Sequence, residues 1–306
     1  MNTVYVDSDA NDDIRRQRLY GGQLFVISPR PTTIALCDFA KNMIREAFGS
    51  VDPLEAQFHM PVEQYVAIVT PLKPKFIHHP ETKKLLRELV ADCGCDLNET
   101  YIDVPRLRMV TSHGYLTSGV GYAHHLHRDT WYSAPLAQLN WWLPIYGIES
   151  ESSMAFHPGY WSKGVKNSSS EFNYYVWNSE GRKSAAQHIK TDTRKQPKAQ
   201  EEMEVDPQIR IIIPPGGVIV FSGAQMHSTV PNTSGRARYS IDFRTVNLAD
   251  LRAGSAAPNV DSHPVGTSLR DFVRGNDGAP MPEDVVQKYD NAPAGDGVLV
   301  YRPAEV

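Results

Sequence analysis

Cysteine is scarce in this sequence: only Cys37, Cys93 and Cys95 occur among 306 residues. An odd and sparse set of thiols argues against a disulfide framework and favours a reducing compartment. Cys93 and Cys95 lie close together in sequence, but no second pair of cysteines completes a zinc site. We therefore expect three free thiols in a cytoplasmic protein.

Long apolar runs and a strong excess of one charge are also missing. No apolar stretch approaches the length of a membrane span, and the first residues lack the basic-then-apolar pattern of a signal peptide. The 31 basic and 35 acidic side chains give a net charge of -4, without a long basic stretch. These absences give no reason to expect nucleic acid or a membrane as a partner.

The N-terminal third has the pattern of helices. Residues 1–20 are polar and predict an arm, and a short β-like run covers 23–27. Apolar positions at helical spacing then predict helices over 32–48, 63–69 and 80–92. We expect residues 1–100 to be mostly helical and to form part of a single domain over 1–306.

From residue 104 the spacing of apolar residues becomes that of strands. The segments that carry this pattern are 106–111, 122–129, 137–146, 153–156, 209–213, 218–221 and 237–244. Short strands separated by Gly and Pro turns predict a β barrel or sandwich over 104–246. With helices packed outside it, the expected fold is mainly β with flanking helices (α+β).

Two segments fall outside the strand pattern. Residues of about 160–205 form an irregular insert, which predicts either a functional lid or a disordered segment. Its basic residues would attract an anionic or carrier-tethered substrate, or else form a solvated loop. Residues 247–306 predict an extended tail with a short helix at 268–273. This tail would wrap the domain or the neighbouring subunit of a homodimer.

The motif His127-Arg128-Asp129 organises the functional hypothesis. On a strand, residues i and i+2 point to the same face, so this imidazole and this carboxylate would project side by side. One distant histidine would complete the 2-His-1-carboxylate triad of non-haem Fe(II) oxygenases. His227 is the candidate, because it follows a Pro-Gly-Gly turn and an apolar strand. Taken alone the motif is weak, since His127 could be a hydrogen-bonded histidine and Asp129 a turn or cap residue.

An arginine downstream strengthens the hypothesis. Arg238 lies eleven residues beyond His227. A buried arginine would give a dicarboxylate co-substrate a bidentate, charge-assisted partner. Arg236 and Arg244 compete for this role, but Arg236 lies at the start of the predicted strand and Arg244 far along it, so we favour Arg238.

With these motifs in this order, the chain resembles the phytanoyl-CoA dioxygenase-type family of Fe(II)- and 2-oxoglutarate-dependent oxygenases. The resemblance covers about 106–246 without the insert. It rests on His127-Arg128-Asp129, on residues 141–144, 151–159, 215–221 and 231–234, and on His227 and Arg238.

The resemblance implies a double-stranded β-helix (jelly-roll) core and a defined set of cofactors. Fe(II) would be bound by His127, Asp129 and His227. The co-substrate 2-oxoglutarate would chelate the metal and pair with Arg238, with a hydroxyl contact from Thr229. O2 would be consumed, and succinate and CO2 released.

The resemblance also narrows the reaction. Halogenases of the family replace the carboxylate of the triad with a small residue, whereas Asp129 is present here. Hydroxylation of a small metabolite or biosynthetic intermediate is therefore expected. Desaturation, cyclisation and epimerisation remain open, because they start from the same hydrogen abstraction.

Other residues near the motif have two interpretations. His125 shares the parity of His127, but a fourth protein ligand would block the O2 position, and His157 fits a turn better than the metal. Trp131 and Tyr132 follow the motif directly and are candidates to line the substrate pocket. Arg108 is either a surface residue of an edge strand, as its neighbour Arg106 could be, or a side chain that binds an acidic substrate group.

Two other classes of function fit the same residues. One is a non-catalytic jelly-roll binding protein that retains a metal for structure. The other is a cupin-type isomerase, or another metal enzyme, that does not use 2-oxoglutarate. Arg238 separates these alternatives from the oxygenase, because only the oxygenase needs a cation for a dicarboxylate co-substrate. The sequence does not identify the substrate, since one scaffold supports many.

Overall fold

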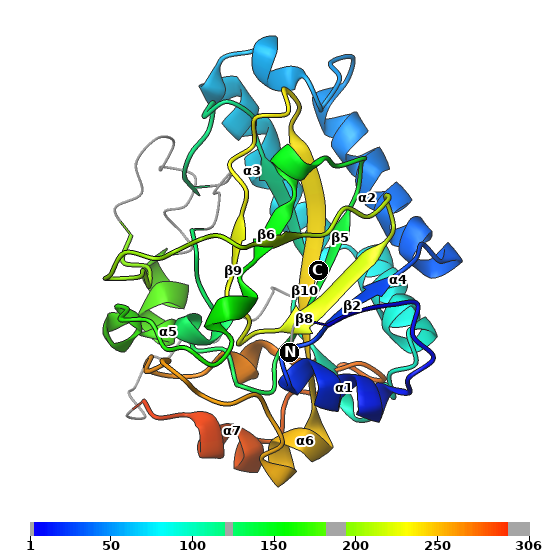
Figure 1. Ribbon diagram of the computed structural model, residues 1–306. Helices are drawn as coiled ribbons and strands as arrows, with labels where there is room; N and C mark the ends of the chain where they lie inside the picture. Colours follow the sequence, from blue (N-terminus) through cyan, green and yellow to red (C-terminus); the bar gives the residue numbers. More distant parts are fainter. Residues whose placement is uncertain (1–2, 120–124, 182–193, 293–306) are drawn as a thin grey trace.

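The longest described strand, β10 (Arg238–Asn247), lies at the centre of the main sheet (Figure 1). The computed structural model describes residues 3–119, 125–181 and 194–292. Within these residues the main sheet has eight strands, in the order β1-β2-β8-β5-β10-β3-β11, with β4 also paired to β10. All pairs are antiparallel except β1 with β2. The other strands are β1 (Val4–Val6), β2 (Leu24–Ile27), β3 (Thr100–Ile102), β4 (Arg106–Val110), β5 (Leu139–Pro144), β8 (Val218–Ser222) and β11 (Val273–Arg274).

A second, smaller sheet packs against the inner side of the main sheet. It consists of β7 (Ile209–Arg210), β6 (Met154–Phe156) and β9 (His227–Thr229), which pair antiparallel. The two sheets meet through an apolar cluster in which the ring centres of Phe156 and Phe221 are 5.0 Å apart. The chain is thus a mixed α/β protein built on a large, mostly antiparallel sheet. This confirms the predicted combination of strands and flanking helices in its coarse form.

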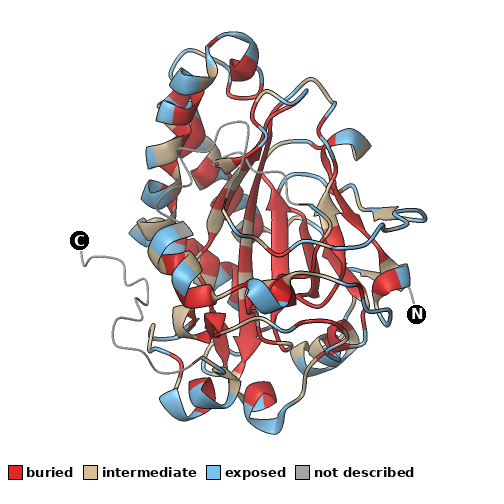
Figure 2. Cartoon of the chain, turned by 90° about the vertical axis from the view of Figure 1, so that its left-hand side faces the viewer, coloured by how far each residue is buried: buried red, intermediate tan, exposed pale blue. Residues whose placement is uncertain are grey.

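Alternation along β10 separates the two faces of the main sheet. Tyr239 and Phe243 point toward the helices and are buried in the larger apolar core. Arg238, Asp242 and Arg244 have the opposite parity and line a cavity between the sheets. Figure 2 shows buried residues concentrated in the strands and exposed residues on the outer helix faces. The polar positions within this buried strand therefore mark the side of the sheet that carries the site.

Three helices cover the outer face of the main sheet. They are α2 (Pro31–Phe48), α3 (Val62–His78) and α4 (Pro80–Asp92). The predicted helices over 32–48 and 80–92 are confirmed. The second helix is longer than the predicted 63–69, because it continues through Pro71 and Pro74. A proline inside a helix removes a hydrogen bond, but the buried side chains of Leu72 and Phe76 hold this segment against the core.

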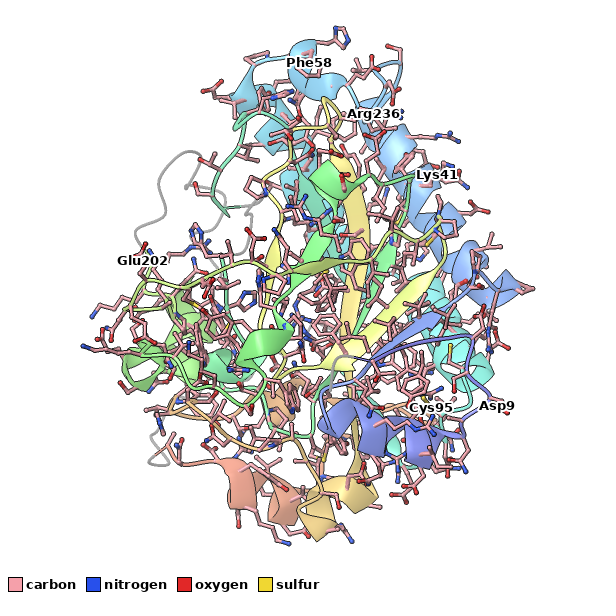
Figure 3. All side chains as sticks on the ribbon, viewed as in Figure 1. Asp9, Lys41, Phe58, Cys95, Glu202 and Arg236 are labelled. Atoms are coloured by element: carbon pink, nitrogen blue, oxygen red, sulfur yellow. The ribbon has the colours of Figure 1, made fainter. Side chains whose placement is uncertain are left out.

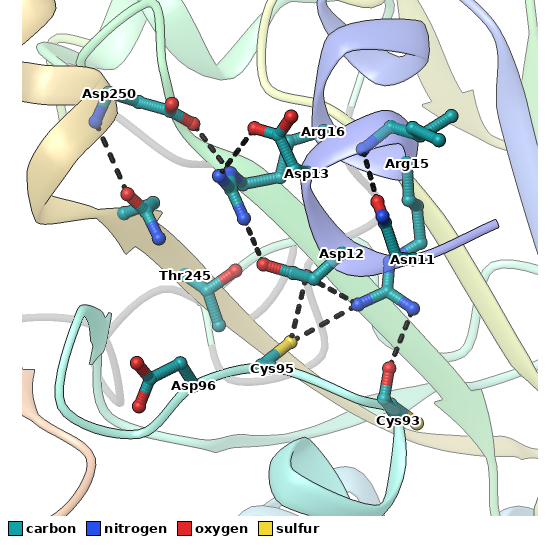
Figure 4. Close-up of polar contacts among 12 residues, drawn as sticks. Asn11, Asp12, Asp13, Arg15, Arg16, Cys93, Cys95, Asp96, Thr245 and Asp250 are labelled. Carbon is teal, nitrogen blue, oxygen red and sulfur yellow. Dashed lines mark hydrogen bonds and ion pairs between the residues drawn. The ribbon is translucent and has the colours of Figure 1, made fainter.

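The prediction of a polar N-terminal arm is wrong. The segment contains β1 and the helix α1 (Asp12–Tyr20), whose first turn is capped by Asn11. Cys95 lies beside this helix (Figure 3). Figure 4 shows the hydrogen bonds and ion pairs that the charged side chains of α1 form. Arg15 donates to the carbonyl of Cys93 over 2.7 Å, and Arg16 pairs with Asp250 over 2.6 Å. These polar residues therefore fix the helix to the protein and do not solvate an arm.

The cysteines match the sequence prediction. Cys37, Cys93 and Cys95 are all buried and free, as expected. In the part of the chain that the structure describes, none of the helices combines the length and the apolar character that crossing a membrane requires.

The insert and the C-terminal segment contain short helices. In the insert these are η6 (Ser169–Glu171), α5 (Tyr174–Val176) and a π-helical turn, η7 (Trp177–Gly181), while residues 182–193 lie outside the described residues. After β10 the chain forms α6 (Leu248–Ala253), η9 (Ser268–Asp271), β11 and α7 (Glu283–Tyr289). The predicted extended tail is therefore wrong as far as residue 292. Because β11 pairs with β3, this segment is part of the main sheet.

Further short helical turns join these elements. They are η1 (Ala56–Phe58), η3 (Asp129–Tyr132), η4 (Ser150–Ser152) and η5 (Pro158–Tyr160).

Candidate metal centre and its cavity

A cavity of about 350 Å³ lies between the two sheets. Its wall combines the inner faces of β4, β5, β8 and β10 with residues of β6 and β9, and with side chains from the insert and the C-terminal segment. Its charged residues and histidines are Lys73, Asp103, Arg106, Arg108, His127, Asp129, Arg194, His227, Arg238, Asp242, Arg244 and Asp271. All the site residues favoured from the sequence, except Trp131, line this cavity.

The structure brings His127, Asp129 and His227 together as a possible metal site. One ligand atom from each lies within 4.8 Å of the others, and all three side chains are buried. Asp129 Oδ1 is 3.3 Å from His127 Nε2 and 3.8 Å from His227 Nε2. Adjacent ligands of an octahedral ion, each roughly 2.1 Å from it, lie about 3 Å apart. The two distances from Asp129 therefore fit a metal ion with only a small contraction.

The backbone sets the orientation of both imidazoles. His127 and His227 form an antiparallel bridge, with each backbone N–H donating to the other carbonyl over 3.0 Å. Their Nδ1 atoms contact backbone carbonyls, that of His125 at 2.6 Å and that of Gln225 at 2.9 Å. We assign the ring protons to Nδ1 from these contacts, which leaves both Nε2 lone pairs directed at the shared site.

Asp129 presents one oxygen to the histidines and the other to the protein. Its Oδ2 accepts a hydrogen bond of 3.1 Å from Gln138 Nε2 and lies 3.5 Å from Arg244 Nε. Burial alone would raise the pKa of Asp129, but His127 and Arg244 hold it well below its usual range. Burial lowers the pKa of His227 to about 3. The site thus offers an anionic carboxylate and a neutral imidazole, the forms that bind a metal.

The backbone reaches this geometry by a path that differs from the predicted strand over 122–129. Residues 120–124 lie outside the described residues, His127 forms a single bridge, and Asp129 begins the 3-10 turn η3. The physical reason is Arg128, which is 1% exposed. It pairs with Asp261 over 3.1 Å and donates to the carbonyl of Ala224 over 2.6 Å. Anchoring Arg128 in this way turns the chain between the two candidate ligands.

Arg238 is a buried cation on the cavity wall. Its Nη1 donates to the carbonyls of Ser152 and Ser153 over 3.2 and 3.3 Å, and its guanidinium lies 5.6 Å from the ring centre of Trp142. Its Nε has no hydrogen-bond partner, and no carboxylate that the structure describes forms an ion pair with it. Burial lowers the pKa of Arg238 to about 10. Thr229 lines the same cavity from β9.

The two competing arginines are placed differently. Arg244 lines the cavity but is engaged by Asp242 at 3.1 Å and by Asp129. Arg236 is exposed and lies near the upper end of the molecule in Figure 3, outside the cavity. Of the three, only Arg238 is both in the cavity and without a carboxylate partner among the described residues.

The two competing histidines are outside the cluster. His157 is buried, with its Nδ1 3.1 Å from the carbonyl of Val205 and its Nε2 3.2 Å from Ser228 Oγ. His125 has an exposed side chain and contributes its carbonyl to His127. Neither belongs to the group of three that could hold a metal.

Two of the three candidate substrate contacts line the cavity, and the third does not. Tyr132 lines the cavity, with its ring centre 5.5 Å from that of His127. Arg108 also lines it, so the edge strand β4 directs this side chain inward. Trp131 does not, because its side chain is fully buried and its Nε1 donates to Asp261 over 2.8 Å. The prediction that Trp131 lines a substrate pocket is therefore wrong.

Sequence reasoning missed several residues of the site. Gln138 orients Asp129, Lys73 reaches the cavity from α3, and Phe272 reaches it from the C-terminal segment. The sequence did carry a signal for Gln138. Gln138 and Asn140 are polar residues in or beside a buried strand, and both have the same parity as Trp142, which indicates one shared face. No comparable signal marks Lys73, since its position depends on how α3 packs.

Comparison with known proteins adds distant structural similarity. No protein-family model matches the chain, and no curated protein matches it. It is similar to the non-haem α-ketoglutarate-dependent carbocyclase SnoK from nogalamycin biosynthesis, with 11% identity, a TM-score of 0.45, and coverage of 90% of this chain and 95% of that one. It is also similar to the non-haem α-ketoglutarate-dependent epimerase SnoN from the same biosynthesis, with 12% identity, a TM-score of 0.38, and coverage of 90% of this chain and 98% of that one. A third similar structure is EvdO2 from Micromonospora carbonacea var. aurantiaca, with 11% identity, a TM-score of 0.44, and coverage of 78% of this chain and 92% of that one. Similarity this distant does not fix a function, which depends on the residues of the site.

Proposed function

We propose that the chain is an Fe(II)- and 2-oxoglutarate-dependent oxygenase of the phytanoyl-CoA dioxygenase type that oxidises a small molecule. The carrying observation is that Arg238, buried and without a carboxylate partner among the described residues, lines the same cavity as the candidate metal cluster. A metal alone needs no such cation, whereas a metal-chelating dicarboxylate needs one for its far end. Bound Fe(II) and 2-oxoglutarate would supply the oxidising chemistry, in which O2 is consumed and succinate and CO2 are released.

The protein's own residues would position the metal. His127, Asp129 and His227 would hold Fe(II) from one side and leave the other side open. Gln138 and Arg244 keep the outer oxygen of Asp129 occupied, so the carboxylate would offer a single oxygen. This arrangement leaves more positions for exogenous ligands than a bidentate carboxylate would.

The co-substrate would lie between the metal cluster and Arg238. Arg238 would pair with the far carboxylate of 2-oxoglutarate, and Thr229 would add a hydroxyl contact. The ring of Trp142 and the carbonyls of Ser152 and Ser153 already fix the guanidinium. Because this cation is preorganised and buried, the pairing would need little rearrangement.

We infer further features of the same enzyme. The two packed sheets, with the candidate ligands in the cavity between them, support a double-stranded β-helix core over about 104–246 in a single domain. Phe172 and Trp177 of the insert line the cavity, which supports a lid that excludes water. A cytoplasmic location and a homodimer remain predictions.

The retained carboxylate guides the proposed reaction. Asp129 occupies the position that a halide would need, so hydroxylation is preferred over halogenation. Desaturation and cyclisation use the same cofactors and the same protein contacts. Product analysis of a turned-over substrate would separate these outcomes.

An anaerobic titration tests the proposed function. Fe(II) and then 2-oxoglutarate are added to the apo-protein, and the weak visible charge-transfer band of a 2-oxo acid chelated to iron is recorded. We expect the band in the wild type and its loss in His127→Ala and His227→Ala. Arg238→Ala should bind metal normally but lose 2-oxoglutarate affinity, whereas the exposed Arg236→Ala should retain both.

The opposite outcomes point to the other functions. If metal binds and no band forms, the oxygenase proposal fails, and a metal-dependent isomerase or a metal-stabilised binding protein takes its place. If 2-oxoglutarate affinity survives in Arg238→Ala, the assignment of this arginine is wrong.

A further inference from the structure

Arg108 extends from β4 into the cavity with one guanidinium nitrogen, Nη1, unused. Its Nε and Nη2 donate to Asp242 over 2.6 and 3.4 Å, and its Nη1 has no hydrogen-bond partner in the part of the chain that the structure describes. The side chain is 28% exposed and lines the cavity. Nη1 can therefore meet a ligand while the ion pair with Asp242 stays intact, and that ion pair fixes the direction of the guanidinium.

The cavity carries an excess of positive charge beyond the needs of the co-substrate. Among the residues that the structure describes, its lining has five arginines and four carboxylates, an excess of one before Lys73 is counted. Bound Fe(II) and 2-oxoglutarate carry opposite charges of equal size and would not change this balance. Lys73, from α3, brings a further basic side chain to the same cavity as Arg108 and adds a positive charge when it is protonated. The excess charge therefore remains for a further anionic ligand.

Aromatic side chains from the insert and from η3 form another part of the wall. The ring centres of Tyr132 and Phe172 are 5.4 Å apart, and those of Phe172 and Trp177 are 6.0 Å apart. All three residues line the cavity. Tyr132 also lies edge-on to His127, which places this aromatic wall beside the candidate metal centre. Faces of this kind favour a flat, ring-bearing molecule.

We propose that the substrate is a carboxylic acid with a flat, ring-bearing body, bound through its carboxylate by Arg108 and Lys73 and through its ring by Tyr132 and Phe172. This inference rests on the proposed function and adds the chemical class of the substrate. Arg238 would hold the co-substrate, and Arg108 would hold the substrate. Arg238 pairs with Val110 of β4, and Arg108 lies two positions before Val110 on the same strand. The two arginines thus separate two carboxylates within one cavity.

Matched probes test this inference without turnover. Binding of 2-naphthoate, naphthalene-2-carboxamide and 2-naphthyl phosphate to the full-length protein is measured by calorimetry, with and without Mn(II) and 2-oxoglutarate. We expect the naphthoate to bind about tenfold or more tightly than the carboxamide, because only the acid gains a charge-assisted hydrogen bond. Arg108→Gln should reduce this ratio to about one, and Arg108→Lys should restore part of it.

The controls separate the site from its surroundings. Arg252→Gln, at a surface residue of α6 with a 54% exposed side chain, should keep the full ratio. The ratio should also persist in Arg238→Ala, where the co-substrate site is disabled. If Arg108→Gln does not fold, the comparison of the probes on the wild type still decides the class of substrate.

Three outcomes would overturn the inference. Equal binding of acid and amide would show that no anionic group is recognised, and tighter binding of the phosphate would replace the carboxylate by a phosphate. Weaker binding of 2-oxoglutarate itself in Arg108→Gln would assign this arginine to the co-substrate. Failure of the proposed function has a different signature, the absence of the iron charge-transfer band, and leaves the comparison of probes on the apo-protein unaffected.

Discussion

Gln138 Nε2 donates to the Oδ2 of Asp129 over 3.1 Å, so a residue just before β5 fixes the carboxylate of the candidate metal centre. The same nitrogen also donates to Asn140 Oδ1 over 2.9 Å, which orients the amide of Gln138. The other carboxylate oxygen of Asp129 is thereby directed at the two histidines. Orientation of a ligand by an outer hydrogen bond commonly strengthens metal binding by about tenfold to a hundredfold.

Gln138→Leu should therefore weaken metal binding by about tenfold or more, because Asp129 loses the donor that orients it. The dissociation constant of Mn(II) is measured by titration under anaerobic conditions. Gln57→Leu is the matched control, because Gln57 is equally buried but bonds to the backbone of Ser112, away from the site. It should lower stability and leave Mn(II) binding unchanged. Unchanged Mn(II) binding in Gln138→Leu would mean that Arg244 alone orients Asp129.

Asp242 is the shared partner of two arginines on the cavity wall. It lies 2.6 Å from Arg108 and 3.1 Å from Arg244. Asp242→Asn should reduce the free energy of unfolding by about 3 kcal/mol, because two largely buried cations would lose their common counter-charge. The double variant Arg108→Gln/Asp242→Asn should lose less than the sum of the single variants. Urea unfolding at neutral pH measures all three, and strict additivity would contradict direct coupling of this pair.

The candidate ligands and Arg238 could be predicted from the sequence because residue type and strand parity carry that information. His227 and Arg238 each begin a strand that follows a clear turn, and alternation along β10 places Arg238 on the face opposite Tyr239. The local backbone of the motif could not be predicted. It depends on Arg128, whose partners Asp261 and Ala224 lie 133 and 96 residues away in sequence.

The N-terminal helix shows a second limit of sequence patterns. A polar segment predicts a solvated arm when its charges have no visible partners. In α1 the charged side chains of Arg15 and Arg16 contact Cys93 and Asp250, which lie 78 and 234 residues away. Partners at such separations leave no periodic signal, because periodicity records only which face of an element is apolar. The same reason hides the contribution of Lys73 to the cavity.

Asp261 links three segments near the candidate metal centre. It accepts from Arg128 Nε over 3.1 Å, Trp131 Nε1 over 2.8 Å and the backbone N–H of Val165 over 3.0 Å. Asp261→Asn should reduce the free energy of unfolding by roughly 3 kcal/mol or more, because Arg128 would remain buried without a counter-charge. Metal affinity should fall as well, since Arg128 separates His127 from Asp129.

The control for this change is an ion pair on the surface. Asp277 pairs with Arg274 over 2.5 Å, but its side chain is 49% exposed. Asp277→Asn should leave both the free energy of unfolding and the metal affinity nearly unchanged, because water screens this ion pair. Chemical denaturation and Mn(II) titration of both variants provide the test. Equal, small effects would show that Arg128 is held by the backbone carbonyls alone.

Lys73 should make stability depend on pH just above neutrality. Burial, together with the nearby Arg108, lowers the pKa of Lys73 to about 7 from the usual 10.5. Between these values the unfolded chain binds a proton that the folded protein has released, so the free energy of unfolding rises with pH. One such group contributes at most about 1.4 kcal/mol per pH unit, and Lys73 should contribute less because its side chain is only partly buried.

The window from pH 7 to 8.5 isolates this effect. The histidines whose pKa is lowered, His78, His125, His157 and His227, titrate below 6.5 in the folded protein and near 6.5 in the unfolded chain. The raised pKa values of Cys37, Cys93 and Cys95 affect stability only when the unfolded thiols ionise, near their ordinary value of 9.0. Urea midpoints of the apo-protein should therefore rise across this window in the wild type and stay level in Lys73→Met. A slope that persists in Lys73→Met would assign the dependence to another group and place the pKa of Lys73 near its ordinary value.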